Sequence, residues 1–354
     1  MGIRDNAGDK PLYPLGNTGV RVTRMGFGGA PLGGFRGAVS DADAAATVGA
    51  AIDGGLNLFD TAPFYGYGRS ELRIGQALRD RARDTFVIST KVGRVLAPYD
   101  RTNPPEGLRA GGLPFAPRFD YSAGGAERSI EHSMMRLGIP ELDIVYIHDV
   151  DVFTHGSQAE AERRYNEAIA GCYPYLKRLR EAGTVKAIGV GLNETAMSLR
   201  FAREADIDCI LLAGRYTLLD QGALDELLPL CRQKDIAIVL GGPFNSGVLA
   251  TGVTQAARYD YAAVPGEIAA RVEAIQQVCS RHDVDLRAAA LQFPLAHPAV
   301  ASVIPGAVSA LEVQGNLKSM ARSIPDDFWE GLKENGLVDP NAPVPNSAPM
   351  TSED

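Results

Sequence analysis

Apolar residues follow two alternating patterns along this chain. Short, mostly apolar runs of strand length are separated by longer segments in which apolar positions recur at helical spacing. Eight runs predict β-strands: Met25–Gly28, Leu56–Asp60, Phe86–Lys91, Asp143–His148, Ala187–Val190, Cys209–Leu212, Ile236–Leu240 and Ala301–Ile304. Seven segments predict helices: Ala42–Asp53, Ser70–Arg79, Ala126–Arg136, Ala159–Glu181, Glu194–Glu204, Ala223–Lys234 and Glu267–Leu295, the last broken near His282–Asp283.

This alternation predicts an α/β protein folded as one (β/α)8 barrel of the TIM type. Nearly all of the predicted strands are dominated by apolar residues, as in parallel sheets covered on both faces. Eight strand–helix repeats within roughly 300 residues favour a closed barrel. A doubly wound open sheet is the alternative. We expect the barrel domain to span residues 1–338 and to carry extra C-terminal helices.

Three segments lie outside this repeat. Leu12–Thr23 contains an Asn-Thr-Gly turn between strand-like residues, which predicts a β-hairpin that closes the bottom of the barrel. Arg94–Tyr121 is a long loop rich in Gly and Pro that follows a strand, where loops commonly shape a substrate pocket. Residues 339–354 are rich in Pro, Ser, Asn and Asp, and they predict a mobile tail.

Charge and composition exclude several classes of protein. The net charge of -8 opposes binding to nucleic acid, which requires a basic surface. No apolar run approaches the ~20 residues of a membrane span, and the first ten residues lack the apolar core of a signal peptide. The four cysteines form no Cys-x-x-Cys pair, which predicts reduced, structural thiols. We therefore expect a soluble cytoplasmic protein that acts on a small molecule, and the sequence leaves its oligomeric state open.

Polar side chains follow the ends of three consecutive predicted strands. Asp60 ends one strand and Tyr65 follows it closely, while Lys91 and His148 end the next two. In a β/α barrel these ends meet at one mouth, where catalytic groups collect. Because an unpaired charge beside an apolar strand is unfavourable, we expect Asp60 and Lys91 to pair.

This set of side chains suits proton transfer coupled to hydride transfer. A tyrosine has a pKa of about 10, and a nearby ammonium group favours its phenolate. We expect Asp60 to hold Lys91, Lys91 to activate Tyr65 as the acid–base group, and a neutral His148 to orient the substrate oxygen. Each residue also has a purely structural interpretation: a helix cap, a lysine stem lying along apolar surface, a loop aromatic and a strand-end histidine.

Two other classes of protein compete with this interpretation. A metal-dependent hydrolase would use the polar cluster of His148, Asp149, Asp151 and His155. The sequence has no His-x-His or His-Glu-x-x-His pattern and no distant ligand set, so we expect no metal site. A non-catalytic barrel is the other alternative, and the complete set of four polar groups opposes it.

The chain resembles the aldo-keto reductases. The resemblance rests on Asp-Thr-Ala-Pro-Phe-Tyr at residues 60–65, on Lys91 within STKVG and on His148 within DIVYIHD, and it extends from about Leu12 to about Glu334. It implies an Asp–Tyr–Lys–His tetrad and a nicotinamide cofactor in a (β/α)8 barrel. The segments GGLPF, IHDVD and AGRYTLLDQ resemble the aldose 1-dehydrogenase branch, which includes L-fucose, L-galactose, D-arabinose, D-threo-aldose and pyridoxal 4-dehydrogenases.

The resemblance also implies where the cofactor lies. Tyr216 matches the residue that stacks on the nicotinamide, and Asn193 matches a ligand of its carboxamide. The family's usual glutamine at a second carboxamide contact is Ala213 here. The remaining implied cofactor contacts are Gly28, Gly29, Gly242, Phe244, Ser246, Gly306, Glu312 and Asn316. Gly26-x-Gly28 is followed by Gly29-Ala30-Pro31 and by no immediate helix, which argues against a Rossmann turn.

The adenosine end of this implied site favours NAD over NADP. NADP-dependent relatives carry a lysine and an arginine that grip the 2′-phosphate, and this chain has Gly306 and Glu312 at those positions. A carboxylate repels a phosphate but accepts hydrogen bonds from ribose hydroxyls. We therefore expect NAD-dependent oxidation of an aldose at C1 to its lactone. Pyridoxal oxidation and NADPH-dependent aldehyde reduction are the alternatives.

Overall fold

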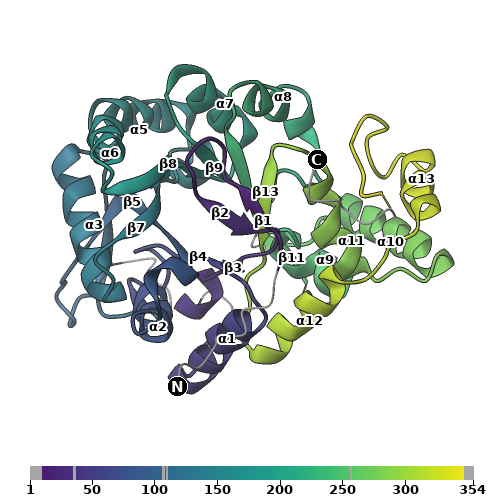
Figure 1. Ribbon diagram of the computed structural model, residues 1–354, viewed down its shortest axis with the longest axis horizontal. Helices are drawn as coiled ribbons and strands as arrows, with labels where there is room; N and C mark the ends of the chain where they lie inside the picture. Colours follow the sequence, from purple (N-terminus) through teal and green to yellow (C-terminus); the bar gives the residue numbers. More distant parts are fainter. Residues whose placement is uncertain are drawn as a thin grey trace.

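The structure is a computed structural model that describes residues 10–346 except 35–36, 106–107, 109–110, 256 and 261. Its centre is a ring of parallel strands that follow one another in chain order (Figure 1). The strands are β3 (Phe27–Gly28), β4 (Leu58–Asp60), β5 (Val87–Ala97), β7 (Leu142–His148), β8 (Val185–Leu192), β9 (Cys209–Ala213), β10 (Ala237–Gly241) and β13 (Val300–Ile304). Parallel bridges from Met25 to Val303 and from Gly28 to Gly306 join the last strand to the first. The predicted (β/α)8 barrel is confirmed, and the open-sheet alternative is wrong.

Helices surround this ring as an outer layer (Figure 1). They are α1 (Asp41–Asp53), α2 (Arg69–Leu78), α3 (Ala123–Leu137), α4 (Val152–His155), α5 (Gln158–Ala170), α6 (Cys172–Glu181), α7 (Thr195–Glu204), α8 (Leu227–Gln233), α9 (Val248–Thr251), α10 (Gly266–Arg281), α11 (Leu286–Gln292), α12 (Ala310–Met320) and α13 (Asp326–Glu334). The break predicted near His282–Asp283 is confirmed, because α10 ends just before it. The single helix predicted over Ala159–Glu181 is wrong: α5 and α6 meet at Gly171, where a Cβ would lie 2.4 Å from the carbonyl oxygen of Tyr121.

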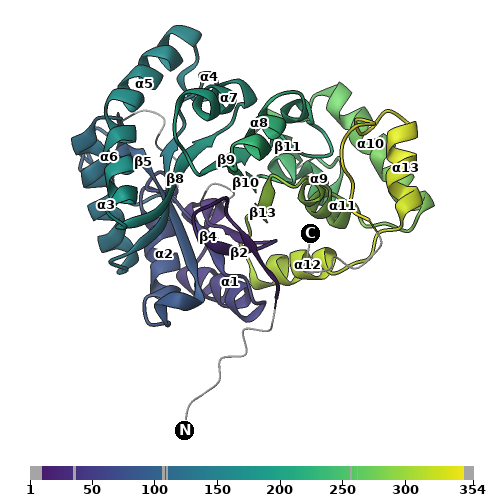
Figure 2. The ribbon, with the colours of Figure 1, turned by 45° about the horizontal axis from the view of Figure 1, so that its top comes forward.

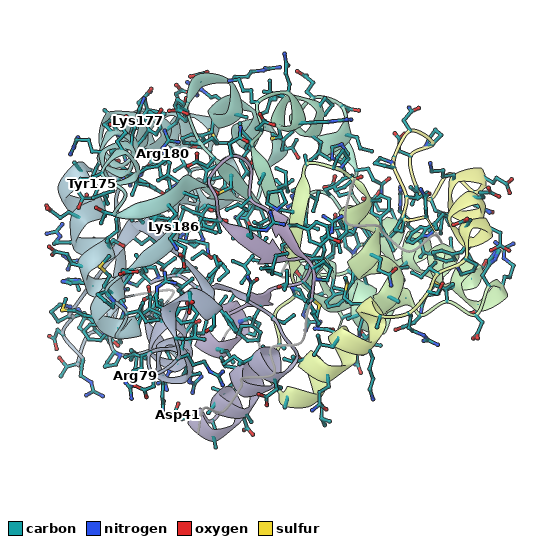
Figure 3. All side chains as sticks on the ribbon, viewed as in Figure 1. Asp41, Arg79, Tyr175, Lys177, Arg180 and Lys186 are labelled. Carbon is teal, nitrogen blue, oxygen red and sulfur yellow. The ribbon has the colours of Figure 1, made fainter. Side chains whose placement is uncertain are left out.

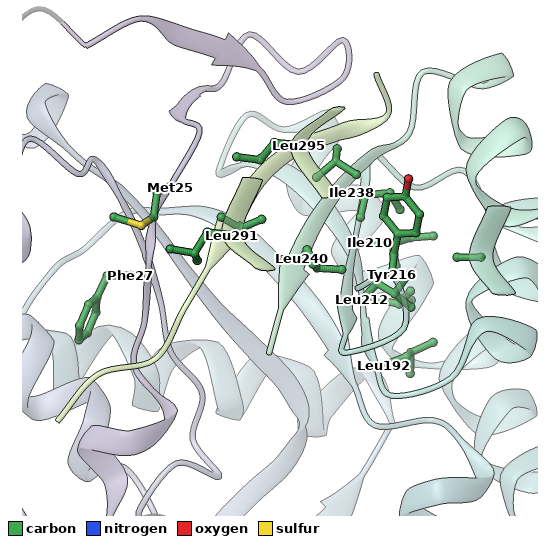
Figure 4. Packing of buried hydrophobic residues seen from close by; sticks show 14 of the residues in the cluster. Met25, Phe27, Leu192, Ile210, Leu212, Tyr216, Ile238, Leu240, Leu291 and Leu295 are labelled. Carbon is green, nitrogen blue, oxygen red and sulfur yellow. The ribbon is translucent and has the colours of Figure 1, made fainter. Parts of the chain in front are cut away.

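Two hydrophobic layers hold the barrel together. Alternate strand residues fill the interior, among them Leu58, Ile144 and Val239, all of them buried. The other strand residues face outward and pack against the helices, as Ile210, Leu212 and Ile238 do in Figure 4. This alternation explains the nearly continuous apolar runs of the sequence, because both faces of each strand are covered.

The predicted N-terminal hairpin is confirmed. Strands β1 (Leu12–Pro14) and β2 (Arg21–Thr23) pair antiparallel and lie across one end of the ring (Figures 1 and 2). Leu15, Val20 and Val22 are buried in the interior layer with residues that begin the strands. The hairpin thereby closes the N-terminal end of the barrel, and the C-terminal end of the strands remains for the polar residues.

The segment Arg94–Tyr121 is not wholly the loop that was expected. Strand β5 continues to Ala97 and pairs antiparallel with β6 (Ala116–Asp120), so a β-hairpin rises from the mouth of the barrel. Residues 106–107 and 109–110, which lie between the two strands in the sequence, are outside the described residues. The hairpin brings Arg94 and Tyr121 to the mouth as buried side chains.

The chain after Val338 is anchored over its first part. The amide of Asp339 donates a hydrogen bond to Oε1 of Gln221 at 3.3 Å, and Ala342 is buried. The mobile tail expected over residues 339–354 stays a prediction, and residues 347–354 lie outside the described residues. Among the described helices, none is long and apolar enough to cross a membrane.

Candidate active site

The four polar residues at the strand ends meet at the mouth of the barrel. Asp60 and His148 end β4 and β7, and Lys91 lies within β5. Tyr65 lies in the turn between β4 and α2, where its backbone amide donates to the carbonyl of Ala62 and its carbonyl accepts from Ser70. The Tyr65 ring centroid is 4.7 Å from Lys91 Nζ and 5.8 Å from the centroid of the His148 ring. The structure thus brings together all four residues that the sequence singled out.

Lys91 and Asp60 form a buried ion pair beneath Tyr65. Lys91 Nζ donates to Asp60 Oδ1 and Oδ2 at 2.8 and 2.7 Å and to the carbonyl oxygen of Thr61 at 2.8 Å. Ser89 Oγ donates to Asp60 as well. Burial raises the pKa of Asp60 and lowers the pKa of Lys91, and their mutual attraction opposes both shifts. Since the ammonium has three acceptors, the geometry favours the ionised pair and directs the charge of Lys91 at Tyr65.

His148 is held in its neutral form. Burial is the largest cause that keeps its pKa well below 6.5, and the positive charges of Arg94 and Lys91 act in the same direction. A histidine whose pKa is lowered carries a proton on only one ring nitrogen at neutral pH. His148 can therefore donate one hydrogen bond to a substrate oxygen above the mouth.

Small residues lie at or next to the ends of the three strands that follow β7. Ala213 and Gly241 end β9 and β10, and Gly191 precedes Leu192, the last residue of β8. A Cβ on Gly191 would face the Lys91 side chain at 3.5 Å, and one on Gly241 would face the interior residue Leu211 at 3.0 Å. Small residues therefore line this half of the mouth at these positions.

Two of the predicted cofactor segments adjoin this half of the mouth. Asn193 follows β8, and its Nδ2 donates to Asp149 Oδ1 at 3.0 Å. The turn after β10 contains Gly242, Phe244 and Ser246, and the φ angles of Gly242 and Ser246 are +60° and +61°.

Asn245 in that turn was not predicted as a site residue. Its side chain is buried, and Oδ1 has no hydrogen-bond partner within the described part of the chain. A buried acceptor without a donor fits a bound group that carries hydroxyl or amide hydrogens, as a nicotinamide dinucleotide does.

The structure contradicts the stacking role expected of Tyr216. Its side chain is fully buried in the outer hydrophobic layer, with ring centroids 5.3 Å from Phe293 and 5.9 Å from His297 (Figure 4). The chain turns at Gly214, whose φ is +68°, and this turn directs the ring away from the mouth. Tyr216 therefore contributes to the core and cannot stack on a ring at the mouth.

Three of the predicted cofactor glycines are required by close packing. A Cβ on Gly28 would lie 2.7 Å from the carbonyl oxygen of Ile304, and one on Gly29 would lie 2.6 Å from that of Asp60. A Cβ on Gly306 would lie 2.6 Å from Cγ of Pro31. A lysine at position 306 would therefore displace Pro31, so glycine there has a packing reason as well as the expected cofactor reason.

Glu312 and Asn316 lie on α12 near the end of β13. The amide of Glu312 donates to Ser309 Oγ at 3.2 Å, while its carboxylate accepts from the amide of Val308 at 3.1 Å. These reciprocal hydrogen bonds resemble a capping box at the start of the helix. Glu312 therefore stabilises the helix N-terminus, and Asn316 is buried one turn further on.

Arg94 at the mouth went unrecognised in the sequence, and Asp149 was considered there only as a ligand of the alternative metal site. Arg94 Nη1 lies 2.5 Å from Asp149 Oδ2 and 3.3 Å from His148 Nδ1, and both side chains are largely buried. The available signal was an arginine three residues after Lys91 and an aspartate directly after His148. Within the described residues, no group of three or more His, Cys, Asp or Glu side chains is arranged to hold a metal ion. The carboxylates of Asp149 and Asp151 already accept hydrogen bonds: Asp149 from Arg94 and Asn193, and Asp151 from the backbone amide of Thr154 in α4.

Comparison with known proteins establishes the family. The sequence matches the Aldo/keto reductase family over residues 24–335, so the chain belongs to that family and is an oxidoreductase. It is 43% identical over 334 residues to pyridoxal 4-dehydrogenase from Microbacterium luteolum, covering 92% of this chain and 97% of that protein. It is 38% identical over 332 residues to D-threo-aldose 1-dehydrogenase from a Pseudomonas species, covering 90% of this chain and 96% of that protein.

Solved structures agree on the fold. The structure matches an aldo-keto reductase from Bacillus halodurans in its holo form with a TM-score of 0.73 and 20% sequence identity, over 93% of this chain and 96% of the other.

The L-galactose dehydrogenase of Arabidopsis thaliana is a further sequence relative. It is 29% identical to this chain over 314 residues, covering 87% of this chain and 88% of that protein. Members of the family use NAD(H) or NADP(H), and the resemblance drawn from the tetrad is confirmed.

Proposed function

We propose that the protein oxidises the cyclic hemiacetal form of an aldose to its lactone with NAD. The observation that carries this proposal is the buried Asp60–Lys91 pair directly beneath Tyr65, beside a neutral His148. That arrangement supplies a base and a hydrogen-bond donor at one place on the mouth. The similarity to an aldose 1-dehydrogenase and to a pyridoxal 4-dehydrogenase supports a hemiacetal substrate.

Proton removal from the hemiacetal hydroxyl is assigned to Tyr65. The ammonium of Lys91 favours the phenolate, which accepts the hydroxyl proton as the C1–O single bond becomes a carbonyl. The bound nicotinamide supplies the acceptor for the hydride that leaves C1. Nε2–H of His148 donates to the same substrate oxygen and holds it near Tyr65. The proton on Tyr65 then passes to solvent, and the lactone leaves.

Asn193 and the turn of Gly242, Phe244 and Ser246 would hold the cofactor. Asn193 is fixed beside His148 through Asp149, so a carboxamide bound to it would place the ring over the small residues of the mouth. The positive φ angles of the turn after β10 expose backbone amides, which suits a pyrophosphate. We assign Asn316 and the start of α12 to the adenosine end.

Pyridoxal is the second candidate substrate, and the 43% identity to pyridoxal 4-dehydrogenase favours it. Pyridoxal also forms an internal hemiacetal, so the same residues would oxidise it by the same steps. The rings of Phe64 and Phe119 pack against Arg94 at the mouth, and flat faces of this kind contact both sugar rings and pyridine rings. We further propose a single catalytic domain in the cytoplasm, in keeping with four free, buried cysteines.

Replacing Glu312 by arginine is expected to shift cofactor preference toward NADP. The wild-type chain has a carboxylate in the first turn of α12 and no side chain at Gly306, so a 2′-phosphate there meets no cation from either position. A guanidinium at position 312 would offer a charge-assisted contact, and we expect the NADP-to-NAD ratio of kcat/KM to rise about tenfold. Steady-state kinetics with both cofactors measure this ratio.

The Glu312→Gln variant is the matched control, because it removes the negative charge and adds no cation. It should raise the ratio less than Glu312→Arg does. A wild-type enzyme that prefers NADP would contradict the cofactor assignment.

A further inference from the structure

A second buried ion pair lies beside His148 at the mouth of the barrel. Arg94 Nη1 and Asp149 Oδ2 are 2.5 Å apart, and their side chains are 7% and 11% exposed. The guanidinium lies over the rings of Phe64 and Phe119, at 4.1 and 4.6 Å from their centroids. These rings exclude water from the pair, so the charges act on their neighbours with little screening.

The backbone around Asp149 is shaped to make this contact. Asp149 has a φ of +54°, a left-handed conformation that non-glycine residues rarely adopt. Its amide donates to the carbonyl of Gly191, and the hydroxyl of Tyr121 donates to the carbonyls of His148 and Asp149. A conformation held by so many contacts is typical of functional sites, where the surrounding structure maintains the strain.

We propose that Arg94 and Asp149 are positioning residues that fix the direction of two hydrogen bonds in the reaction. They make His148 a donor toward the substrate oxygen, and they make Asn193 an acceptor toward the carboxamide of the cofactor. This inference rests on the proposed function, and it adds to it two residues and the hydrogen-bond polarity that they impose.

The polarity at His148 follows from the chemistry of arginine. Arg94 Nη1 lies 3.3 Å from Nδ1 of His148, and a guanidinium can only donate. Nδ1 must therefore be the unprotonated nitrogen, which leaves the hydrogen on Nε2. Nε2 lies 3.4 Å from Asp149 Oδ2, so this carboxylate holds the Nε2 hydrogen only through a long, weak contact, and a substrate oxygen at the mouth can take its place.

The polarity at Asn193 follows from the chemistry of carboxylates. Asn193 Nδ2 lies 3.0 Å from Asp149 Oδ1 and 3.4 Å from Asp151 Oδ2. Ionised carboxylates only accept, so the amide nitrogen must face them and the amide oxygen must face away. One carboxylate, Asp149, therefore contacts Arg94, His148 and Asn193 together, and it couples the substrate side of the mouth to the cofactor side.

The first test reads the tautomer of His148 by NMR. The chain has five histidines, so protein labelled with ¹⁵N-histidine gives few signals, and the His148→Gln variant identifies the signal of His148. In the wild type we expect a neutral ring with hydrogen on Nε2 and no titration between about pH 5 and 8. In Arg94→Met we expect mixed tautomers and a titration that begins at higher pH, because a cation that opposes protonation is gone. The less disruptive Arg94→Lys keeps a charge for Asp149 and loses the donor to Nδ1, so it should also mix the tautomers.

The second test measures cofactor affinity by NADH fluorescence. Asp149→Asn suits the left-handed backbone, because asparagine adopts it readily. It weakens the charge-assisted contact that orients Asn193, and we expect the Kd for NADH to rise about tenfold while His148 keeps its hydrogen on Nε2. If Arg94 and Asp149 served stability alone, Arg94→Met and Asp149→Asn would lower the melting temperature and leave the His148 tautomer and the Kd for NADH unchanged.

Arg180→Met is the matched control. Arg180 also pairs with a carboxylate, Asp208, through Nη1 at 2.9 Å, but it lies in the outer helical layer (Figure 3). The Arg180→Met variant should change neither the tautomer of His148 nor the Kd for NADH. An unchanged His148 tautomer in both Arg94 variants, or an unchanged Kd for NADH in Asp149→Asn, would overturn the proposal. A wild-type protein that binds no NADH would instead refute the proposed function, and the NMR result would stand apart from it.

Discussion

Replacing Tyr65 by phenylalanine is expected to lower kcat by about 10²–10⁴-fold, the contribution typical of a positioned acid–base group. The variant keeps the aromatic ring above Lys91, so the packing at 4.7 Å is retained and only the hydroxyl is lost. The affinity for NAD should change little, because the assigned cofactor contacts follow β8 and β10 or lie on α12. Steady-state kinetics together with a cofactor titration separate the two effects.

Tyr67→Phe provides the control two residues away. Tyr67 is also buried, and its ring packs against that of Phe64 with centroids 6.2 Å apart. It should retain most of the wild-type turnover. Equal losses in the two variants would mean that the loop, rather than the Tyr65 hydroxyl, determines the rate.

Replacing Lys91 by methionine is expected to abolish activity and to destabilise the fold at the same time. Lys91 provides the ammonium beneath Tyr65, and it is the only cation within hydrogen-bond distance of Asp60 among the described residues. Breaking a buried pair by removing one partner costs about 3–5 kcal/mol, because a charge is left buried without compensation. Urea denaturation at neutral pH measures this loss of unfolding free energy.

The double variant Asp60→Asn/Lys91→Met separates stability from catalysis. It removes both charges, so much of the lost stability should return while turnover stays absent. A double variant that is no more stable than Lys91→Met would contradict the account of the pair.

The alkaline limb of the rate profile gives an independent check on Lys91. Because burial lowers the pKa of Lys91 below its usual 10.5, the ammonium is present below that lowered pKa and is lost as the pH rises through it. Turnover that depends on this charge should therefore decline at a lower pH than an ordinary lysine would require.

The fold and the tetrad could be predicted because both depend on local patterns. Each strand is covered on both faces, so each appears in the sequence as an apolar run, and Asp60, Lys91 and His148 stand out where those runs end. Parallel strands in a barrel end at one mouth, so position along a strand was enough to bring these residues together.

The errors concern positions that tertiary packing decides. Tyr216 stands only three residues beyond a strand end, but the left-handed Gly214 turns its ring into the outer layer. The break at Gly171 depends on the approach of Tyr121, fifty residues away in the sequence. Arg94 was assigned to a long loop, because the strands β5 and β6 that pair here are separated in the sequence by a stretch rich in Gly and Pro.

The measurement that tests the central claim most directly is the formation of NADH by the purified protein. The assay supplies NAD or NADP with L-fucose, L-galactose, D-arabinose or pyridoxal, for the wild type and for Tyr65→Phe. The account predicts NAD-linked turnover of at least one of these hemiacetals, a lactone as the product, and near-complete loss of turnover in Tyr65→Phe. No reduced cofactor with any of them, or equal rates in the wild type and Tyr65→Phe, would contradict it.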